Sequence, residues 1–423
     1  MTKPDLRTEA IAGVTTFFTM AYIVVVNPAI LSTPGTGMAF SGVLTATVLI
    51  CFSMTLLMGV YAKLPFAVAP GMGINAYFTF TVILTQQVWW QTALGIVFWA
   101  GVLFLLISIT PIRETIAKAI PAELRIATAA GIGIFLTFIG LKNAGLITSD
   151  PVTFVKLGTL GFTTLLTIVG FIVTVILLIR RSALAFLAGI FVVTLIAWAA
   201  GVVKAPDQMF SAPDFETVFL KLDILGALKL SLLPAIIGIL FTDLFDSIST
   251  FMGVAHAADL LDENGNPRNL RQGLIVDSIA TFGAGAAGTS SGTAYIESIA
   301  GINSGGRTGL TSVFTALCFL PCFFLAPLAA MVPPFATAPV MIFVGAAMFK
   351  SVSSINFARI EEGMPAFLTI ILIPLTFSIT QGILWGFIAH VGLYLVTGRR
   401  KDVHPVMYVL AAVAVGLLVL EHT

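Results

Sequence analysis

The chain is 423 residues long, 58% of its residues are hydrophobic, only 10% are charged, and its formal net charge is +1. This composition, with a mean hydropathy of +1.05, excludes an ordinary soluble globule, and the balanced charge gives no reason to expect a nucleic-acid partner. The sequence therefore predicts an all-helical, multi-pass protein of the cell membrane that is surrounded by the lipid bilayer.

Hydrophobic runs predict fourteen membrane-spanning helices, since a span needs roughly 17 to 25 residues and fewer where protein shields it. The seven helices of the first half are expected near residues 9–31, 41–62, 74–86, 88–110, 126–143, 162–179 and 182–203. The seven of the second half are expected near 231–256, 269–286, 293–303, 308–331, 335–350, 364–378 and 381–397. We expect residues 1–203 and 231–398 to form two repeats, joined by a polar segment at 204–230. Residues 399–423 hold a basic cluster and an apolar run, 406–420, which either spans the membrane or lies against the bundle.

Lysine and arginine residues predict the orientation of these helices. With the N-terminus in the cytoplasm, sixteen of the 21 basic residues fall on the inner side of the membrane. The five that fall outside are Lys142, Lys156, Lys204, Lys221 and Lys229. Because cytoplasmic loops carry the excess of positive charge in membrane proteins, this distribution predicts fourteen helices and a cytoplasmic N-terminus.

Two stretches rich in glycine and small polar residues interrupt the hydrophobic pattern. One is 286–300 and the other is 70–80, where Asn75-Ala76-Tyr77 corresponds to Thr293-Ala294-Tyr295. Paired glycine-interrupted half-helices mark the midplane binding site in transporters that are built from inverted repeats. Because seven is an odd number, the two halves must enter the membrane from opposite sides, so the predicted repeat is inverted.

Glu297 is the principal candidate for the functional centre. It lies about one turn inside the helix expected at 293–303, and a carboxylate at membrane depth is costly unless it faces a cavity. Asp243 and Asp246 are three residues apart in the eighth helix, so they share one face. Three such acids cannot all stay ionised in a low dielectric, and at least one should bind and release a proton during transport. The alternative is that these acids only hold helices together through Ser, Thr and backbone groups.

Asp277, in the ninth helix, has two interpretations. It follows Arg268 and Arg271 closely in sequence, so it could pair with one of them near the membrane interface, or it could take part in transport. The three cysteines lie in apolar segments and the four histidines form no spaced ligand set. No metal or cofactor is therefore expected.

An amide and several aromatic side chains could recognise a flat heterocycle. The Asn75 amide can both donate and accept hydrogen bonds, or it can simply cap the third helix. An aromatic ring could stack on a planar ligand, although core packing is an equally ordinary role. The candidates for stacking are Phe17, Phe18, Tyr22, Phe78 and Tyr295.

Four stretches in chain order resemble the AzgA-like purine permeases of the nucleobase/ascorbate transporter (nucleobase:cation symporter-2) superfamily. They are 9–28 in the first helix, 69–78 at the third, 241–246 in the eighth and 288–298 at the tenth. The resemblance implies fourteen helices in two inverted seven-helix repeats, divided into a core and a gate domain, with short strands that cross before the third and tenth helices. It also implies transport of hypoxanthine, adenine and guanine, typically with protons, and a homodimer is expected.

Carried over residue by residue, the resemblance implies that Glu297 hydrogen-bonds the base, with contacts from Tyr295 and Ile296. A carboxylate of the eighth helix would be the second anchor. Asp243 is the first choice, and Asp246 is close behind it or is the proton site instead. Relatives that transport uracil and xanthine have Glu and His where this chain has Asp and Ser, so their proton-coupling roles do not transfer directly.

We therefore expect a secondary active importer of purine bases that works by proton symport and alternating access, with Thr293, Asn75, Tyr22 and Phe78 near the base. Sodium coupling is one alternative. A second is an anion transporter or channel of the same fold, which should have a basic or neutral site. A third is a membrane-embedded enzyme or receptor, which would need a nucleophile, a metal set or a sizeable soluble domain.

Overall fold

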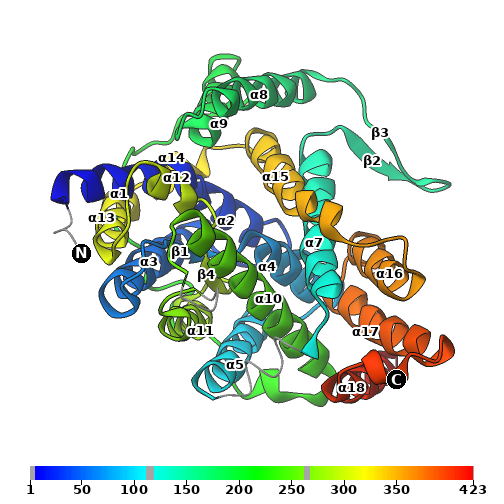
Figure 1. Cartoon of the computed structure of the whole chain (residues 1–423). Helices are drawn as coiled ribbons and strands as arrows, with labels where there is room; N and C mark the ends of the chain where they lie inside the picture. Colours follow the sequence, from blue (N-terminus) through cyan, green and yellow to red (C-terminus); the bar gives the residue numbers. More distant parts are fainter. Residues whose placement is uncertain (1–4, 111–118, 262–266, 423) are drawn as a thin grey trace.

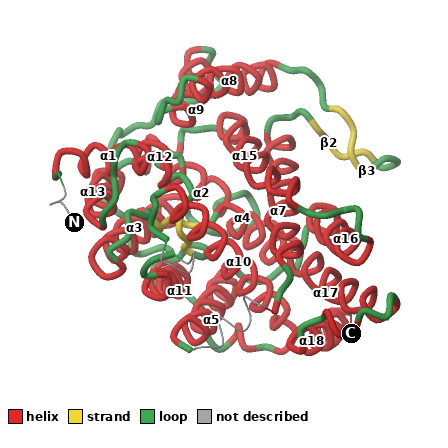
Figure 2. Tube along the Cα trace, in the orientation of Figure 1, coloured by secondary structure: helices red, strands yellow, loops and turns green. Residues whose placement is uncertain are grey.

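The computed structural model describes residues 5–110, 119–261 and 267–422, and its regular structure is almost entirely helical (Figure 2). Among the described residues, eight helices are long and apolar enough to cross a membrane, judged by length and composition. Shorter apolar helices lie at Met72–Thr85, Ala185–Ala199, Gly309–Phe324 and Pro405–Val419. The chain thus has the helical, multi-pass architecture that its composition predicts (Figure 1).

The helices follow the predicted order, and most differ from the prediction only at their ends. The helix expected at 9–31 is interrupted after Met20, and the one expected at 308–331 is divided into three shorter helices. In the first half they are α1 (Leu6–Met20), α2 (Ile23–Leu31), α3 (Phe40–Leu57) continued by the π-helix η1 (Met58–Ala62), α4 (Met72–Ala76) continued by the π-helix η2 (Tyr77–Thr85), α5 (Trp90–Ile109), α7 (Ala122–Asn143), α8 (Phe162–Ile179) and α9 (Ala185–Ala199). In the second half they are η3 (Gly226–Leu228), η4 (Leu230–Leu232), α10 (Leu233–Ala257), α11 (Leu270–Ala287), α12 (Ser298–Asn303), α13 (Gly309–Phe319), η5 (Leu320–Phe324), α14 (Ala326–Ala330), α15 (Pro334–Phe349), η6 (Lys350–Ser354), α16 (Ile360–Thr376), α17 (Ile379–Val396), η7 (Arg400–Asp402) and α18 (Pro405–His422).

Helices of the two halves are interleaved: α7 packs along α15, and α5 packs along α11. Small residues allow the first of these contacts. A Cβ on Gly133 would lie 2.5 Å from the carbonyl oxygen of Gly345, and one on Gly345 would lie 2.3 Å from that of Gly133. Membrane helices use such residues to bring backbones together, because lipid supplies no hydrophobic force between them.

Two short strands cross near the centre, as the family resemblance implies. Strand β1 (Val68–Pro70) pairs antiparallel with β4 (Gly292–Ala294), with Ala69 opposite Thr293. Each strand leads into a short helical segment, so we call the two units the first arm (Val68–Thr85) and the second arm (Gly292–Asn303). Because the strands are antiparallel, the arms run in opposite directions.

The second arm corrects one prediction. The helix expected at 293–303 is wrong at its start, because Gly292–Ala294 is a strand and helix α12 begins only at Ser298. Glu297 is therefore the residue that precedes the helix, not one that lies a turn inside it. The strand forms here because the backbone of residues 292–294 pairs with β1. The local helix propensity of the sequence does not reveal this long-range pairing.

A hairpin that sequence analysis did not predict connects α7 to α8. Its strands are β2 (Ile147–Asp150) and β3 (Phe154–Leu157), and it reaches outward from the helices toward the right of Figure 1. The backbone amides of Thr153 and Val152, together with Lys156, lower the pKa of Asp150 to about 2. The Asp150–Lys156 ion pair, at 3.0 Å, therefore persists at neutral pH and is lost only as the pH falls toward 2.

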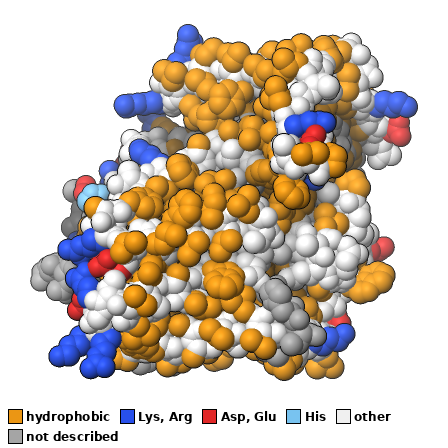
Figure 3. All heavy atoms as spheres, turned by 90° about the vertical axis from the view of Figure 1, so that its right-hand side faces the viewer, with side chains coloured by type: hydrophobic (Ala, Val, Ile, Leu, Met, Phe, Trp, Pro, Cys, Tyr) orange, Lys and Arg blue, Asp and Glu red, His pale blue; other side chains and the backbone are white. Residues whose placement is uncertain are grey.

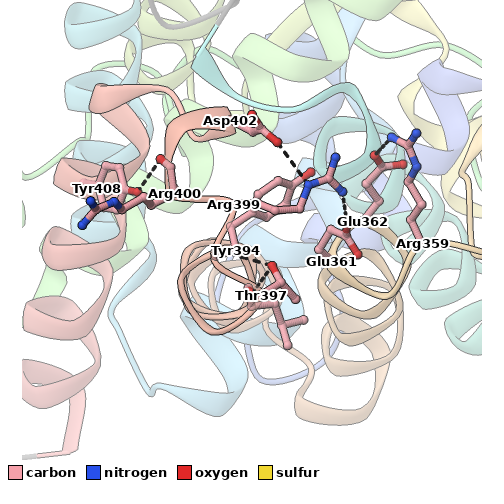
Figure 4. A network of polar contacts seen from close by, with 10 residues as sticks. Arg359, Glu361, Glu362, Tyr394, Thr397, Arg399, Arg400, Asp402 and Tyr408 are labelled. Atoms are coloured by element: carbon pink, nitrogen blue, oxygen red, sulfur yellow. Dashed lines mark hydrogen bonds and ion pairs between the residues drawn. The ribbon is translucent and has the colours of Figure 1, made fainter.

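The C-terminal helix α18 packs along α17 and runs antiparallel to it. Near its start, the Tyr408 hydroxyl donates to the Arg400 carbonyl (2.9 Å) beside the end of α17, where Arg399 pairs with Glu361 and with Asp402 (Figure 4). Toward its other end, Leu417 packs in one cluster with residues near the starts of α17 and α10. Figure 3 shows one side of the molecule covered largely by hydrophobic side chains, with most of the visible Lys and Arg near the edges of the view.

Candidate functional site

The crossing point of the two arms is held by a short set of hydrogen bonds. The backbone amide of Tyr295 donates to the Ala67 carbonyl at 2.9 Å, and the Tyr295 hydroxyl donates to the Pro70 carbonyl at 2.6 Å. The amide of Gly71 donates to the Ser291 carbonyl at 2.9 Å. These bonds satisfy backbone groups that the membrane interior cannot, so the irregular backbone at this depth is stable.

A cavity of about 80 Å³ lies at this crossing point, and it is several times larger than the ~10–15 Å³ that one water molecule requires. Both arms contribute to its wall, together with α10, α15 and the break between α1 and α2. The lining residues are Tyr22, Gly71, Met72, Gly73, Asp246, Thr250, Thr293, Ala294, Tyr295, Ile296, Glu297, Val344 and Met348.

Glu297 is held in place at the wall of the cavity by Tyr22. The Tyr22 hydroxyl donates to Glu297 Oε1 at 2.6 Å, and the Tyr22 ring packs edge-on against Phe186 of α9, with ring centroids 5.2 Å apart. Tyr22 itself is fully buried in the break between α1 and α2. The Tyr22 hydroxyl thus orients the Glu297 carboxylate, which forms part of the cavity wall.

The structure separates the two aspartates of α10. Asp246 lines the cavity together with Glu297, whereas Asp243 is not in the lining. Asp243 has no solvent exposure, and the Thr281 hydroxyl of α11 donates to its carboxylate. Sequence reasoning left open which of the two faces Glu297, because a three-residue spacing places both on one face without fixing the rotation of the helix.

The other predicted site residues divide in the same way. Thr293, Tyr295, Ile296 and Tyr22 line the cavity, and Asn75 and Phe78 do not. Asn75 is fully buried in the first arm, where its Oδ1 accepts from the Ser290 hydroxyl and its Nδ2 has no partner among the described residues. The roles of these residues toward a base stay predictions.

Asp277 does not form the arginine pairing that its sequence position suggests. The side chain has no solvent exposure and accepts from the Ser247 hydroxyl of α10, while Arg271 donates to the Ile109 carbonyl at 3.1 Å. Sequence reasoning missed Ser247 and Thr281 as hydrogen-bond donors to the buried aspartates. The spacing could have indicated them, because Asp243 and Asp277 are each followed by a hydroxyl residue four positions later on the same helix.

A larger groove, of about 1150 Å³, lies between the hairpin and helices α7 and α16. Its lining is mostly apolar, and it includes Lys142 but none of the acids discussed above. The groove is therefore distinct in chemistry from the central cavity, where two carboxylates meet small, hydroxyl and aromatic residues.

The family model described as Permease family matches residues 7–384. The chain belongs to this family. The match confirms the resemblance that four separate stretches suggested, and it makes the protein a multi-pass membrane permease, not an enzyme. The first and last residues of the matched range enclose both arms, so the cavity lies inside the part that defines the family.

Relatives match along nearly the whole length. The adenine permease AdeP of Escherichia coli (strain K12) is 42% identical over 406 residues, which cover 96% of this chain and 91% of the relative. The guanine/hypoxanthine permease PbuO of Bacillus subtilis (strain 168) is 39% identical over 418 residues, which cover 97% of this chain and 96% of the relative.

Solved structures of anion transporters share the fold. The transmembrane domain of the cyanobacterium bicarbonate transporter BicA superposes with a TM-score of 0.65 at 15% identity, covering 91% of this chain and 98% of that domain. The murine Slc26a9 anion transporter in its inward-facing state gives a TM-score of 0.64 at 10% identity, covering 94% of this chain and 69% of that one. At these identities the likeness shows the fold alone.

Proposed function

We propose that this protein is a secondary active transporter that imports purine bases, namely adenine, guanine or hypoxanthine, by proton symport. The observation that carries the proposal is the cavity at the crossing point of the arms, where Glu297 and Asp246 present two carboxylates to a ligand. Full-length similarity to permeases named for adenine and for guanine and hypoxanthine supports the substrate class.

The chemistry of a purine edge fits this cavity. Purine rings carry N–H donors at their edges, and a carboxylate accepts such donors in charge-assisted bonds that are stronger than neutral ones. Tyr22 already donates to Oε1 of Glu297, and an ionised carboxylate has further acceptor sites for an N–H of the base. Apolar side chains of α15, Val344 and Met348, would cover the flat face of the ring.

The proposed transport cycle uses two inverted repeats, 1–203 and 231–398. In this proposal they form a core domain that carries both arms and a gate domain that moves against it, in a homodimer with cytoplasmic N-termini. The similarity to BicA and Slc26a9 and the antiparallel pairing of β1 with β4 support this arrangement. The membrane potential supplies about 2.3 kcal/mol per charge per 100 mV, so one co-transported proton suffices for accumulation.

Uptake measurements test the proposal. The protein is expressed in a strain that lacks its own purine permeases, and uptake of labelled adenine, guanine and hypoxanthine is followed with and without a protonophore. We expect saturable uptake of at least one base that collapses with the proton gradient. No saturable uptake of any purine would overturn the function, and uptake that resists the protonophore but requires sodium would overturn the coupling.

An anion substrate is the competing function, because the solved structures of similar fold carry anions. Among the described residues that line the cavity there are two acids and no Lys or Arg. A bound anion would face two carboxylates, which is unfavourable at membrane depth. We expect that excess bicarbonate or sulfate does not compete with purine uptake, and competition by either anion would favour the alternative.

A further inference from the structure

Helices α10 and α11 are joined beside the cavity by a reciprocal pair of polar contacts. The Thr281 hydroxyl of α11 donates to Asp243 of α10, and the Ser247 hydroxyl of α10 donates to Asp277 of α11. Asp243 and Ser247 are four residues apart, as are Asp277 and Thr281, so each helix presents one acid and one hydroxyl on the same face. We call these four residues the carboxylate ladder.

The carboxylate oxygens of the ladder outnumber the hydroxyl hydrogens that can donate to them. Asp243 Oδ1 and Asp277 Oδ1 have no hydrogen-bond partner among the described residues, although both side chains are completely buried. The single hydroxyl proton of Thr281 is also within reach of the Gly292 carbonyl (3.1 Å) and the Asp277 carbonyl (3.2 Å). Since a hydroxyl donates one hydrogen bond, two buried carboxylate oxygens are left without a donor.

No basic side chain compensates these acids. Among the described residues neither aspartate forms an ion pair, and the sequences of α3 and α5, which pack against α11, contain no charged residue. The titratable groups that face Asp277 are Asp243 and Asp246 of α10, and β4 contributes none. Two uncompensated, fully buried carboxylates are strongly unfavourable, so the ladder favours the binding of a positive charge.

Thr293 connects the ladder to the cavity. Its side chain lines the cavity, and its hydroxyl lies 3.3 Å from that of Ser247 and 3.5 Å from Asp277 Oδ2. Thr293 belongs to strand β4, which leads directly to Tyr295 and Glu297. Strand β4 thus links the ladder to Tyr295 and Glu297, which line the cavity.

We propose that Asp243 and Asp277 together bind the coupling proton, at a site beside the base and separate from it. This inference rests on the proposed symport function and adds the groups that carry the ion. A proton on one carboxylate leaves a single negative charge on the pair and supplies the missing donor. The same proton leaves to water when the site opens to the cytoplasm, so no other reactant is needed. The hydroxyls of Thr293 and Ser247 provide the route from the cavity.

The test compares Asp277→Asn with the wild type in proteoliposomes, with Asp259→Asn, an exposed aspartate just beyond α10, as the matched control. The probe is whichever labelled base the wild type transports. Equilibrium binding and exchange without a gradient report on the base site. Accumulation driven by an imposed proton gradient reports on coupling, and at 100 mV one co-transported charge sustains about 50-fold accumulation.

We expect Asp277→Asn to bind and exchange the base but to lose accumulation and its dependence on pH, while Asp259→Asn behaves as the wild type does. Proton-driven accumulation that survives in Asp277→Asn would overturn the inference and leave the proposed function intact. A wild type that transports no purine would instead overturn the function itself. If the wild type accumulates base only with sodium and Asp277→Asn loses this, the ladder binds sodium, and the proton assignment is wrong.

A second set of variants applies if Asp277→Asn does not fold. Asp277→Glu keeps the acid and moves it, and Thr281→Val removes one donor from the ladder, with Thr281→Ser as its control. We expect the first two to change the pH profile of accumulation and Thr281→Ser to preserve it. Unchanged pH profiles in both Asp277→Glu and Thr281→Val would overturn the inference.

Discussion

The two arms have the same geometry but different chemistry. The first arm, Val68–Thr85, contains no acid, and its buried polar group nearest the crossing point is the amide of Asn75. The second arm, Gly292–Asn303, carries Glu297 and lies beside Asp246 and the carboxylate ladder. In the proposed function, therefore, the first arm positions the site and the second arm supplies the carboxylate that binds the base.

The contacts of the first arm are those of a support. The Thr55 hydroxyl lies within hydrogen-bond distance of both the amide (2.9 Å) and the carbonyl (3.0 Å) of Val68. In the middle of the arm, the Tyr77 hydroxyl lies 2.6 Å from that of Thr380 in α17. These contacts fix the arm to its neighbours on both sides, and none of them involves a charged group.

Glu297→Gln should have the largest effect, because it removes the charge of the second arm while keeping the shape of the side chain. A hydrogen bond to a charged group is worth about 1.5–3 kcal/mol, which corresponds to about 10- to 150-fold in base affinity. The measurement is equilibrium binding of labelled purine to purified protein. Glu216→Gln, an exposed glutamate, is the control, and near-normal affinity in Glu297→Gln would move the site elsewhere.

Gly288→Ala tests the entry to the second arm. Gly288 ends α11 with φ +99°, and a Cβ there would lie 2.6 Å from Val218 Cβ and 2.8 Å from the Val218 carbonyl oxygen. A left-handed conformation costs a residue with a side chain roughly 1–2 kcal/mol, and the contact adds to this. We expect a lower melting temperature in detergent. Gly283→Ala, where the atom nearest to the added Cβ is 3.8 Å away, should have the melting temperature of the wild type. Equal melting temperatures for the wild type, Gly283→Ala and Gly288→Ala would show that the turn at Gly288 tolerates a side chain.

Tyr22→Phe should have a smaller effect on binding. It removes the 2.6 Å hydrogen bond to Glu297 while leaving the ring in place, and such a bond contributes about 0.5–1.5 kcal/mol, or up to 3 when the acceptor is charged. We expect weaker base binding than in the wild type and stronger binding than in Glu297→Gln. The exposed Tyr61→Phe serves as control. A loss as large as that of Glu297→Gln would make Tyr22 a direct ligand of the base.

Asn75→Ala should have the smallest effect on base affinity if the first arm is a support. The variant leaves the Ser290 hydroxyl without its acceptor in a fully buried position, which costs about 1–3 kcal/mol of stability. Thermal unfolding should therefore change more than base binding does. A fall in affinity equal to that of Glu297→Gln would show that the first arm is not only a support and that Asn75 contacts the base.

Much of this architecture can be predicted from the sequence, because hydrophobic runs, glycine breaks and the family resemblance all report on local features. They locate the helices, both arms and Glu297. The hairpin at Ile147–Leu157 was missed because its exposed strands are four residues long and carry no buried alternation. The roles of Asp243, Asp246 and Asp277 could not be separated, because they depend on how α10 is rotated against α11 and β4.

A structure with a bound purine tests the account most directly. The protein is crystallised or imaged with the base that it transports. We predict that the base lies in the central cavity, with one edge hydrogen-bonded to Glu297 and with Asp246 facing it. A base that contacts only the first arm, or one that lies in the groove between the hairpin and α7, would contradict the account.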